Sequence, residues 1–184
     1  MIERIKRIKE KLKQSQKGVS CFGSKSHKFL SQLVPEKDLL KFEADYDISL
    51  PEEYRTFIKE VGVGAGPHYG LHDLSNWLCD DETEVGEKDF LSSPCLLEPS
   101  EGRGFTGWEE DLEEKHGIPW ERRYQGILSI SSQGCTYLSG LVITGPMRGQ
   151  IIFLDLDDQH PNFTKLGFLD WYEKWLDAAM LVKK

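Results

Sequence analysis

Residues 50–74, LPEEYRTFIKEVGVGAGPHYGLHDL, combine an amphipathic segment, a glycine-rich turn and an aromatic stretch, and the rest of the chain can be placed around them. Apolar side chains recur in the first part at the three-and-four spacing of one helical face. They are Leu50, Tyr54, Phe57, Ile58 and Val61. Because charged residues occupy the other faces, we predict a helix that packs one side against the core.

The two ends of this helix carry recognisable signals. Pro51 suits the first helical position, where its missing N–H costs nothing, so we expect Leu50 as the cap. Glu52 and Glu53 place negative charge at the positive end of the helix dipole, and Gly62 is the natural left-handed stop. The glycines follow a helix and precede a proline, whereas a phosphate-binding loop follows a strand. We therefore expect a structural turn.

Further along the chain, apolar and β-branched residues are typical of a sheet. Residues 126–131, 136–144 and 150–156 read GILSIS, TYLSGLVIT and QIIFLDL, which favours strands. The sequence GPMRG at 145–149 predicts a turn between the last two. Residues 168–180 show a Trp-rich stripe at helical spacing. The predicted fold class is α+β, with a single mostly antiparallel sheet and helices packed against it.

Charge divides the chain unevenly. The formal net charge is −8, but residues 1–28 carry nine Lys and Arg against two acidic residues, so the remainder has a net charge of about −15. A stripe of Ile2, Ile5, Ile8 and Leu12 predicts a basic amphipathic helix over residues 1–13. This helix could pack against the acidic body, extend into solvent, or touch membrane or nucleic acid. Residues 14–26 read as a linker, which divides the chain into a 1–26 extension and a 27–184 domain.

The sequence offers little that favours an enzyme or a membrane protein. It has no apolar run near the roughly 18 residues that cross a bilayer and no signal-peptide core, so we expect a cytoplasmic protein. His68 and His72 lack a third ligand at a recognised metal spacing, and Cys135 has no evident base. We predict no cofactor and no metal. A hydrolase that uses Cys135 or the two histidines remains the least favoured alternative.

Several blocks of the chain resemble one family. The 50–74 stretch, LLKFEADYDISLP at 39–51, GCTYLSGLVITGPMRGQIIFLD at 134–155 and FLDWYEKWLDAAM at 168–180 are similar to the SUKH superfamily, which includes the yeast Smi1/Knr4 cell-wall regulators. The order and spacing of the blocks carry this resemblance, which spans about residues 35–180. It implies the same α+β fold. The chain departs from the pattern in a longer middle segment, at about 77–121, and in its basic N-terminal extension.

The resemblance also implies a function. Many bacterial members of the superfamily are immunity proteins, which hold a cognate toxin inactive, and such toxins are often nucleases or deaminases. We therefore expect a non-enzymatic protein-binding module with a basic protein partner, no direct binding of nucleic acid by the acidic body, and no membrane contact. The sequence sets no oligomeric state, and we favour a monomer. A regulatory scaffold of the Smi1/Knr4 kind is the alternative.

Two acidic runs, at 80–89 and 109–114, are the candidate contacts for such a partner, although a solvated face is the commoner explanation of such runs. Two aromatic residues near the glycine turn could supply the desolvated centre that tight binding needs. The candidate partner-binding residues are Tyr69, Trp77, Asp80, Asp81, Glu82, Glu84, Glu109, Glu110, Asp111, Glu113 and Glu114.

Overall fold

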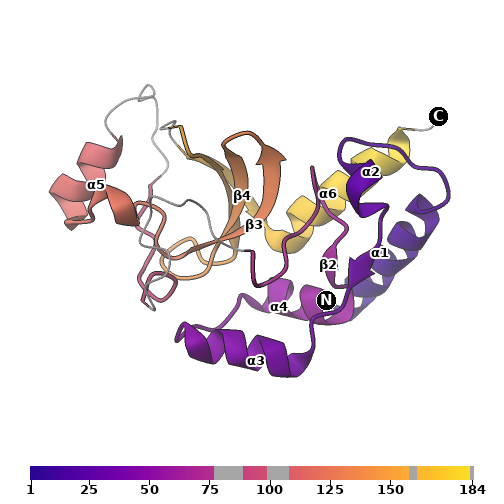
Figure 1. Cartoon of the computed structure of the whole chain (residues 1–184), viewed down its shortest axis with the longest axis horizontal. Helices are drawn as coiled ribbons and strands as arrows, with labels where there is room; N and C mark the ends of the chain where they lie inside the picture. Colours follow the sequence, from indigo (N-terminus) through magenta and orange to yellow (C-terminus); the bar gives the residue numbers. More distant parts are fainter. Residues whose placement is uncertain (77–88, 99–107, 158–160, 183–184) are drawn as a thin grey trace.

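The computed structural model describes residues 1–76, 89–98, 108–157 and 161–182, and it confirms an α+β fold (Figure 1). The helices are α1 (Ile2–Ser15), α2 (Ser24–His27), α3 (Glu36–Asp45), α4 (Glu52–Glu60), α5 (Trp108–His116) and α6 (Phe168–Leu181), with a 3₁₀ turn at Trp120–Arg122. The strands are β1 (Ser31–Gln32), β2 (Val63–Gly64), β3 (Ile127–Gly134), β4 (Tyr137–Val142), β5 (Gln150–Asp155) and β6 (Asn162–Gly167).

Helix α4 forms from the predicted segment, but it begins one residue later than the sequence suggests. Pro51 is the cap, because its ψ of 133° is extended rather than helical, and its carbonyl accepts the N–H of Arg55. Leu50 is therefore outside the helix, which corrects the expected cap. Gly62 ends the helix with a φ of +107°, and a Cβ there would lie 2.4 Å from the Gln32 carbonyl oxygen. Glycine at position 62 is therefore needed for two reasons: it adopts the left-handed conformation that ends the helix, and it leaves room for the close approach of β1.

The main sheet is antiparallel throughout, with the strand order β3-β4-β5-β6. The predicted hairpin is confirmed as β4 and β5, and the segment that follows adds β6 at the edge. Strands β1 and β2 form a second small sheet. Leu71 bridges to Gly64 on one side and to Ser131 on the other, so the turn after β2 joins the two sheets.

Aromatic rings of α4 and α6 form the centre of the core. Phe57 lies 5.0 Å from Phe168 and 4.4 Å from Tyr172 between ring centroids, and Tyr54 lies 5.0 Å from Phe168. All four side chains are buried. The Tyr172 hydroxyl donates to the Ala65 carbonyl at 2.9 Å, which ties α6 to the chain just after β2. The helix and the turn of residues 50–74 therefore meet α6 directly.

Helix α1 packs against α6, which is the first of the three arrangements considered for it (Figure 1). Ile5, Ile8 and Leu12 are buried in the same core cluster as the aromatic rings. Residues 14–26, read as a linker, contain the end of α1 and the start of α2 instead of forming one irregular segment. The division at residue 26 stays a prediction about folding, and these contacts are the reason to test it.

Candidate partner-binding surface

Two neighbouring aromatic side chains are exposed beside the glycine turn. Tyr69 is 49% exposed and Phe22, just before α2, is 62% exposed. Their ring centroids lie 5.3 Å apart in an edge-to-face arrangement, and Phe22 also meets the ring of His68 at 6.2 Å. We call Phe22, His68 and Tyr69 the aromatic patch. The sequence identified Tyr69 but not Phe22, because Phe22 lies in a segment without periodicity and reaches Tyr69 only through the tertiary fold.

The backbone fixes the position of the patch. His68 adopts a left-handed φ of +53°, a conformation that a non-glycine side chain adopts only where its surroundings enforce it. The preceding carbonyl, of Pro67, accepts hydrogen bonds from the Gly70 N–H and the Ser131 hydroxyl, both at 3.0 Å. A Cβ at Gly23 would lie only 1.4 Å from the His68 carbonyl oxygen. The segment before α2 and the turn therefore touch through backbone, and glycine is required at position 23.

A groove of about 520 Å³ adjoins the patch. It lies between strands β5 and β6 of the sheet and α6, and its lining includes the aromatic side chains of Phe153, Phe163, Trp171 and Trp175. Trp171 is buried, whereas the other three rings are partly exposed. His68 lines the groove as well as contacting Phe22, so the groove and the patch form one continuous surface. Burial lowers the pKa of His68, which favours its neutral form.

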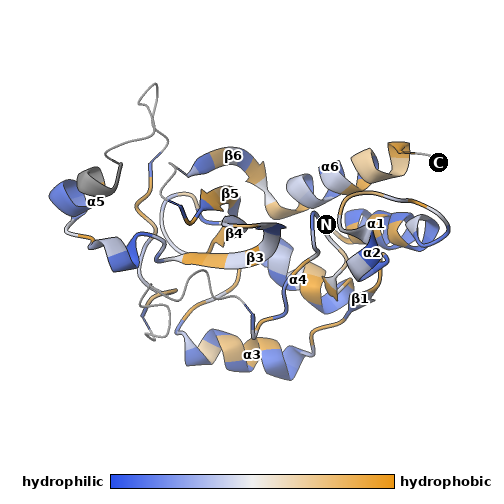
Figure 2. Cartoon of the chain, turned by 45° about the horizontal axis from the view of Figure 1, so that its top comes forward, coloured by the Kyte–Doolittle hydropathy of each residue, from blue (hydrophilic) through white to orange (hydrophobic). Residues whose placement is uncertain are grey.

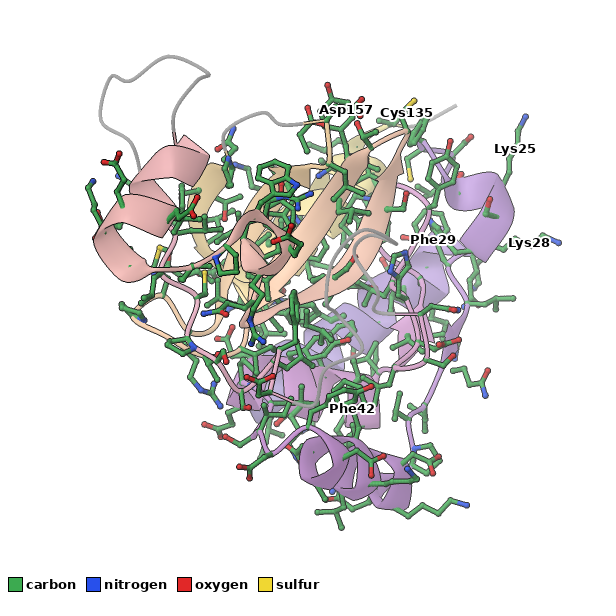
Figure 3. The ribbon with its side chains drawn as sticks, turned by 60° about the vertical axis from the view of Figure 1, so that its left-hand side comes forward. Lys25, Lys28, Phe29, Phe42, Cys135 and Asp157 are labelled. Carbon is green, nitrogen blue, oxygen red and sulfur yellow. The ribbon has the colours of Figure 1, made fainter. Side chains whose placement is uncertain are left out.

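Lysines border this surface. Lys174 lines the groove, whereas Lys25 lies on α2 and Lys28 directly follows it, and both of these project outward from the molecule (Figure 3). All three are exposed, and within the parts of the chain that the structure describes none of them forms an ion pair. The acidic residues of α6 behave differently, because Asp170, Glu173 and Asp177 pair with Arg4, Arg7 and Lys11 of α1. The aromatic surface is therefore bordered by unpaired positive charge.

The acidic candidates lie elsewhere. Glu113 and Glu114 are exposed on α5, which lies at the opposite end of the molecule from α2 and is largely hydrophilic where it is described (Figures 1 and 2). Glu109, Glu110 and Asp111 also belong to α5, but their side chains fall outside the described part of the structure, as do Trp77, Asp80, Asp81, Glu82 and Glu84. The structure does not join Tyr69 with α5 into a single site.

The residues considered for hydrolysis do not form a linked pair in the described regions. Cys135 is exposed in the turn between β3 and β4, and no hydrogen bond to a histidine is described for it. His72 is partly buried, and its backbone N–H donates to the Ile130 carbonyl. Burial lowers the pKa of His72. Among the residues described, no group of three or more His, Cys, Asp or Glu side chains gathers closely enough to hold a metal ion.

The fold and the surface define a class of protein: a small α+β domain with a fixed, exposed aromatic patch and an adjoining groove. A comparison with protein families matches residues 33–174 to the SMI1 / KNR4 family (SUKH-1). The chain belongs to this family. The match covers the glycine turn, the main sheet and the first half of α6, whereas α1, α2 and Phe22 precede it.

Comparisons with curated proteins and with solved structures find no match to the chain. Among the described residues, the longest helices are too short and too polar to cross a bilayer.

Proposed function

We propose that this chain is a non-enzymatic protein-binding module of the immunity type, which binds a cognate toxin in the cytoplasm and holds it inactive. The exposed aromatic patch is the observation that supports binding. Aromatic residues are enriched at protein interfaces relative to the rest of the surface, and such side chains dominate the binding energy there. Membership of the SMI1 / KNR4 family supports a domain that acts through other proteins.

The charge of the chain suggests how a toxin would be engaged. A nuclease or deaminase has a basic cleft that binds phosphates, and carboxylates can occupy such a cleft in their place. Glu113 and Glu114 present carboxylates to solvent on α5. In this proposal they attract the basic partner, while the aromatic patch contributes the desolvated contact.

Co-expression tests the proposal. The C-terminal domain encoded by the neighbouring gene would be induced in cells that contain or lack this chain. We expect growth arrest without the chain and growth with it, together with co-purification of the two proteins. A neighbouring product that is not toxic, or that neither binds the chain nor is neutralised by it, contradicts the immunity role.

A regulatory scaffold is the second candidate, and one observation favours it. Helix α2, which follows Phe22, and α5 lie at opposite ends of the molecule (Figure 1), so two proteins could bind at the two ends together. Isolation of a complex containing this chain and two different partners would support the scaffold over the immunity protein.

Hydrolysis is tested separately. If the chain turned over an ester or peptide substrate and lost that turnover on Cys135→Ala or His72→Ala, the proposal of a non-enzymatic module would be wrong. We expect no turnover, because the described geometry gives Cys135 no hydrogen-bonded base.

A further inference from the structure

The groove beside the patch has the chemistry of a docking site for an apolar side chain. Three of its aromatic rings, those of Phe153, Phe163 and Trp175, are only partly buried, so apolar surface remains in contact with water. The ring of Trp175 is also held in place, because it stacks on Phe29 at 5.9 Å and meets Tyr172 edge-on at 5.2 Å. A ligand side chain that enters the groove would remove this surface from water without reordering the rings.

The charges around the groove and the patch indicate that the ligand is negatively charged. Lys174 lines the groove, and Lys25 and Lys28 follow Phe22 by three and six residues, in α2 and just after it. The segment 13–28 contains four lysines and no acidic residue. Carboxylates of α6 that could neutralise this region are already paired with α1. An incoming carboxylate would therefore meet unpaired ammonium groups.

A protein segment fits this surface better than a nucleic acid does. The rings of the groove lie between β6 and α6 rather than on an open sheet, where bases could stack one after another. The chain as a whole has a formal charge of −8, which repels a continuous phosphate backbone more strongly than a short peptide with a few carboxylates.

We propose that the groove and the aromatic patch together bind an acidic segment of a protein partner, with an apolar side chain of the segment in the groove and its carboxylates on Lys174, Lys25 and Lys28. The inference rests on the proposed protein-binding role and specifies the chemistry of one contact. An acidic segment of a partner would then bind at the α2 end of the molecule, and the carboxylates of α5 would remain free to bind basic surface of a partner. A single partner with both features, or two partners, would satisfy it.

The first experiment uses the full chain and a fluorescent peptide in which Glu alternates with Phe. We expect saturable binding by fluorescence anisotropy, weakened by salt. A peptide with Lys in place of every Glu, and oligothymidylate, are the comparison probes, and both should bind at least about tenfold more weakly. Equal binding of the Lys peptide, stronger binding of oligothymidylate, or no binding of the acidic peptide overturns the proposal.

Variants then locate the site. Phe22→Ala and Lys174→Glu change exposed side chains, so the fold should persist. Each substitution should lower the affinity for the acidic peptide about tenfold. Leu40→Ala is the matched control, because Leu40 is a similarly exposed apolar residue on α3, outside the groove and the patch. The proposed site is wrong if the affinity for the acidic peptide changes less than about twofold in both test variants. It is also wrong if Leu40→Ala changes that affinity as much as the test variants do.

Cross-linking provides a readout that needs no variant. A benzoylphenylalanine in place of the central Phe of the acidic peptide should label the chain within residues 20–24, 67–69 or 162–178. Labelling confined to α5 overturns the inference. Neutralisation of the toxin by the unsubstituted chain tests the proposed function separately, so this contact can be wrong while that role stands.

Discussion

Glu173 is the side chain through which α1 and α6 are most closely tied. It is buried, and it accepts hydrogen bonds from Arg4 and Arg7, the Arg7 pair at 2.9 Å. Burial alone would raise the pKa of Glu173, but the two guanidinium groups outweigh that effect, so its pKa lies below the usual range. The carboxylate is therefore ionised at neutral pH and stabilises the folded state.

We predict that Glu173→Gln lowers the free energy of unfolding by about 1–3 kcal/mol at pH 7, because hydrogen bonds to a charged group are lost at a buried site. Since the folded pKa is depressed, this contribution is present above the unfolded pKa and disappears as the pH falls through the folded value. Urea unfolding at pH 7 and at about pH 3 measures both effects, and the two proteins should converge in acid.

Asp177→Asn is the control for this measurement. Asp177 lies on the same helix and pairs with Lys11, but it is exposed. Exposed pairs contribute about 0–1 kcal/mol. If Asp177→Asn costs as much as Glu173→Gln, burial is not the source of the effect.

Helix α1 supplies three buried side chains to the core, which is more than a peripheral extension would. Ile8 is fully buried, and Ile5 and Leu12 nearly so. Each such side chain contributes about 1.5–3 kcal/mol on burial, and a domain is stable by only about 5–15 kcal/mol in total. We therefore predict that a chain lacking residues 1–16 is unfolded or has a much lower melting temperature.

A milder version of this test compares two isoleucines of α1. Ile8→Ala should cost about 2–5 kcal/mol, whereas Ile2→Ala, at a residue that is 73% exposed, should be nearly silent. If the chain lacking residues 1–16 instead melts cooperatively at an unchanged temperature, residues 17–184 fold without α1, as the domain division drawn from the sequence requires.

The elements that the sequence predicted are those with a strong local signal. Helix α4 and α6 show clear helical spacing, and the hairpin of β4 and β5 has apolar strands around a Gly-Pro turn. Strand β6 was not predicted, because apolar and polar residues do not alternate in NFTKLG, and the strand accordingly has no regular pattern of burial. Strands β1 and β2 have two residues each and exist through their pairing. Such strands carry almost no sequence pattern.

The candidate site was predictable only in part, for a related reason. Tyr69 could be identified because it follows an obvious glycine turn. Phe22 and the groove depend on contacts between segments far apart in sequence, such as the approach of Gly23 to His68. The uneven charge made packing of α1 against the acidic body one of three possible arrangements, and only the fold shows that it does so and that Glu173 is its partner.

Three histidines across the protein share one physical state. Burial lowers the pKa of His27, His68 and His72. A histidine with a depressed folded pKa binds fewer protons in the folded than in the unfolded protein, so stability falls as the pH drops below the unfolded value of about 6.5. We predict a loss of about 1.4 kcal/mol for each unit of combined pKa depression.

Urea unfolding between about pH 7 and pH 5 measures this loss, because the carboxylates with depressed pKa values, such as Glu173, remain ionised in that window. His27→Gln should flatten the profile, since His27 is buried and its Nε2 has no partner in the described residues. A free energy of unfolding that is constant over this range would show that the histidines titrate normally.

The separation of charge along the molecule leads to a kinetic prediction about α5. Glu113 and Glu114 are exposed, so Glu113→Gln with Glu114→Gln should leave the melting temperature nearly unchanged. If these carboxylates steer a basic partner, the pair of substitutions should slow association and flatten its salt dependence, with little change in dissociation. Stopped-flow mixing with the cognate partner at several salt concentrations gives both rates.

Asp38→Asn with Asp47→Asn changes the net charge equally from exposed positions before α4, and it should slow association less. Equal effects of the two pairs would mean that only the net charge of the protein matters, and α5 would then be a solvated face.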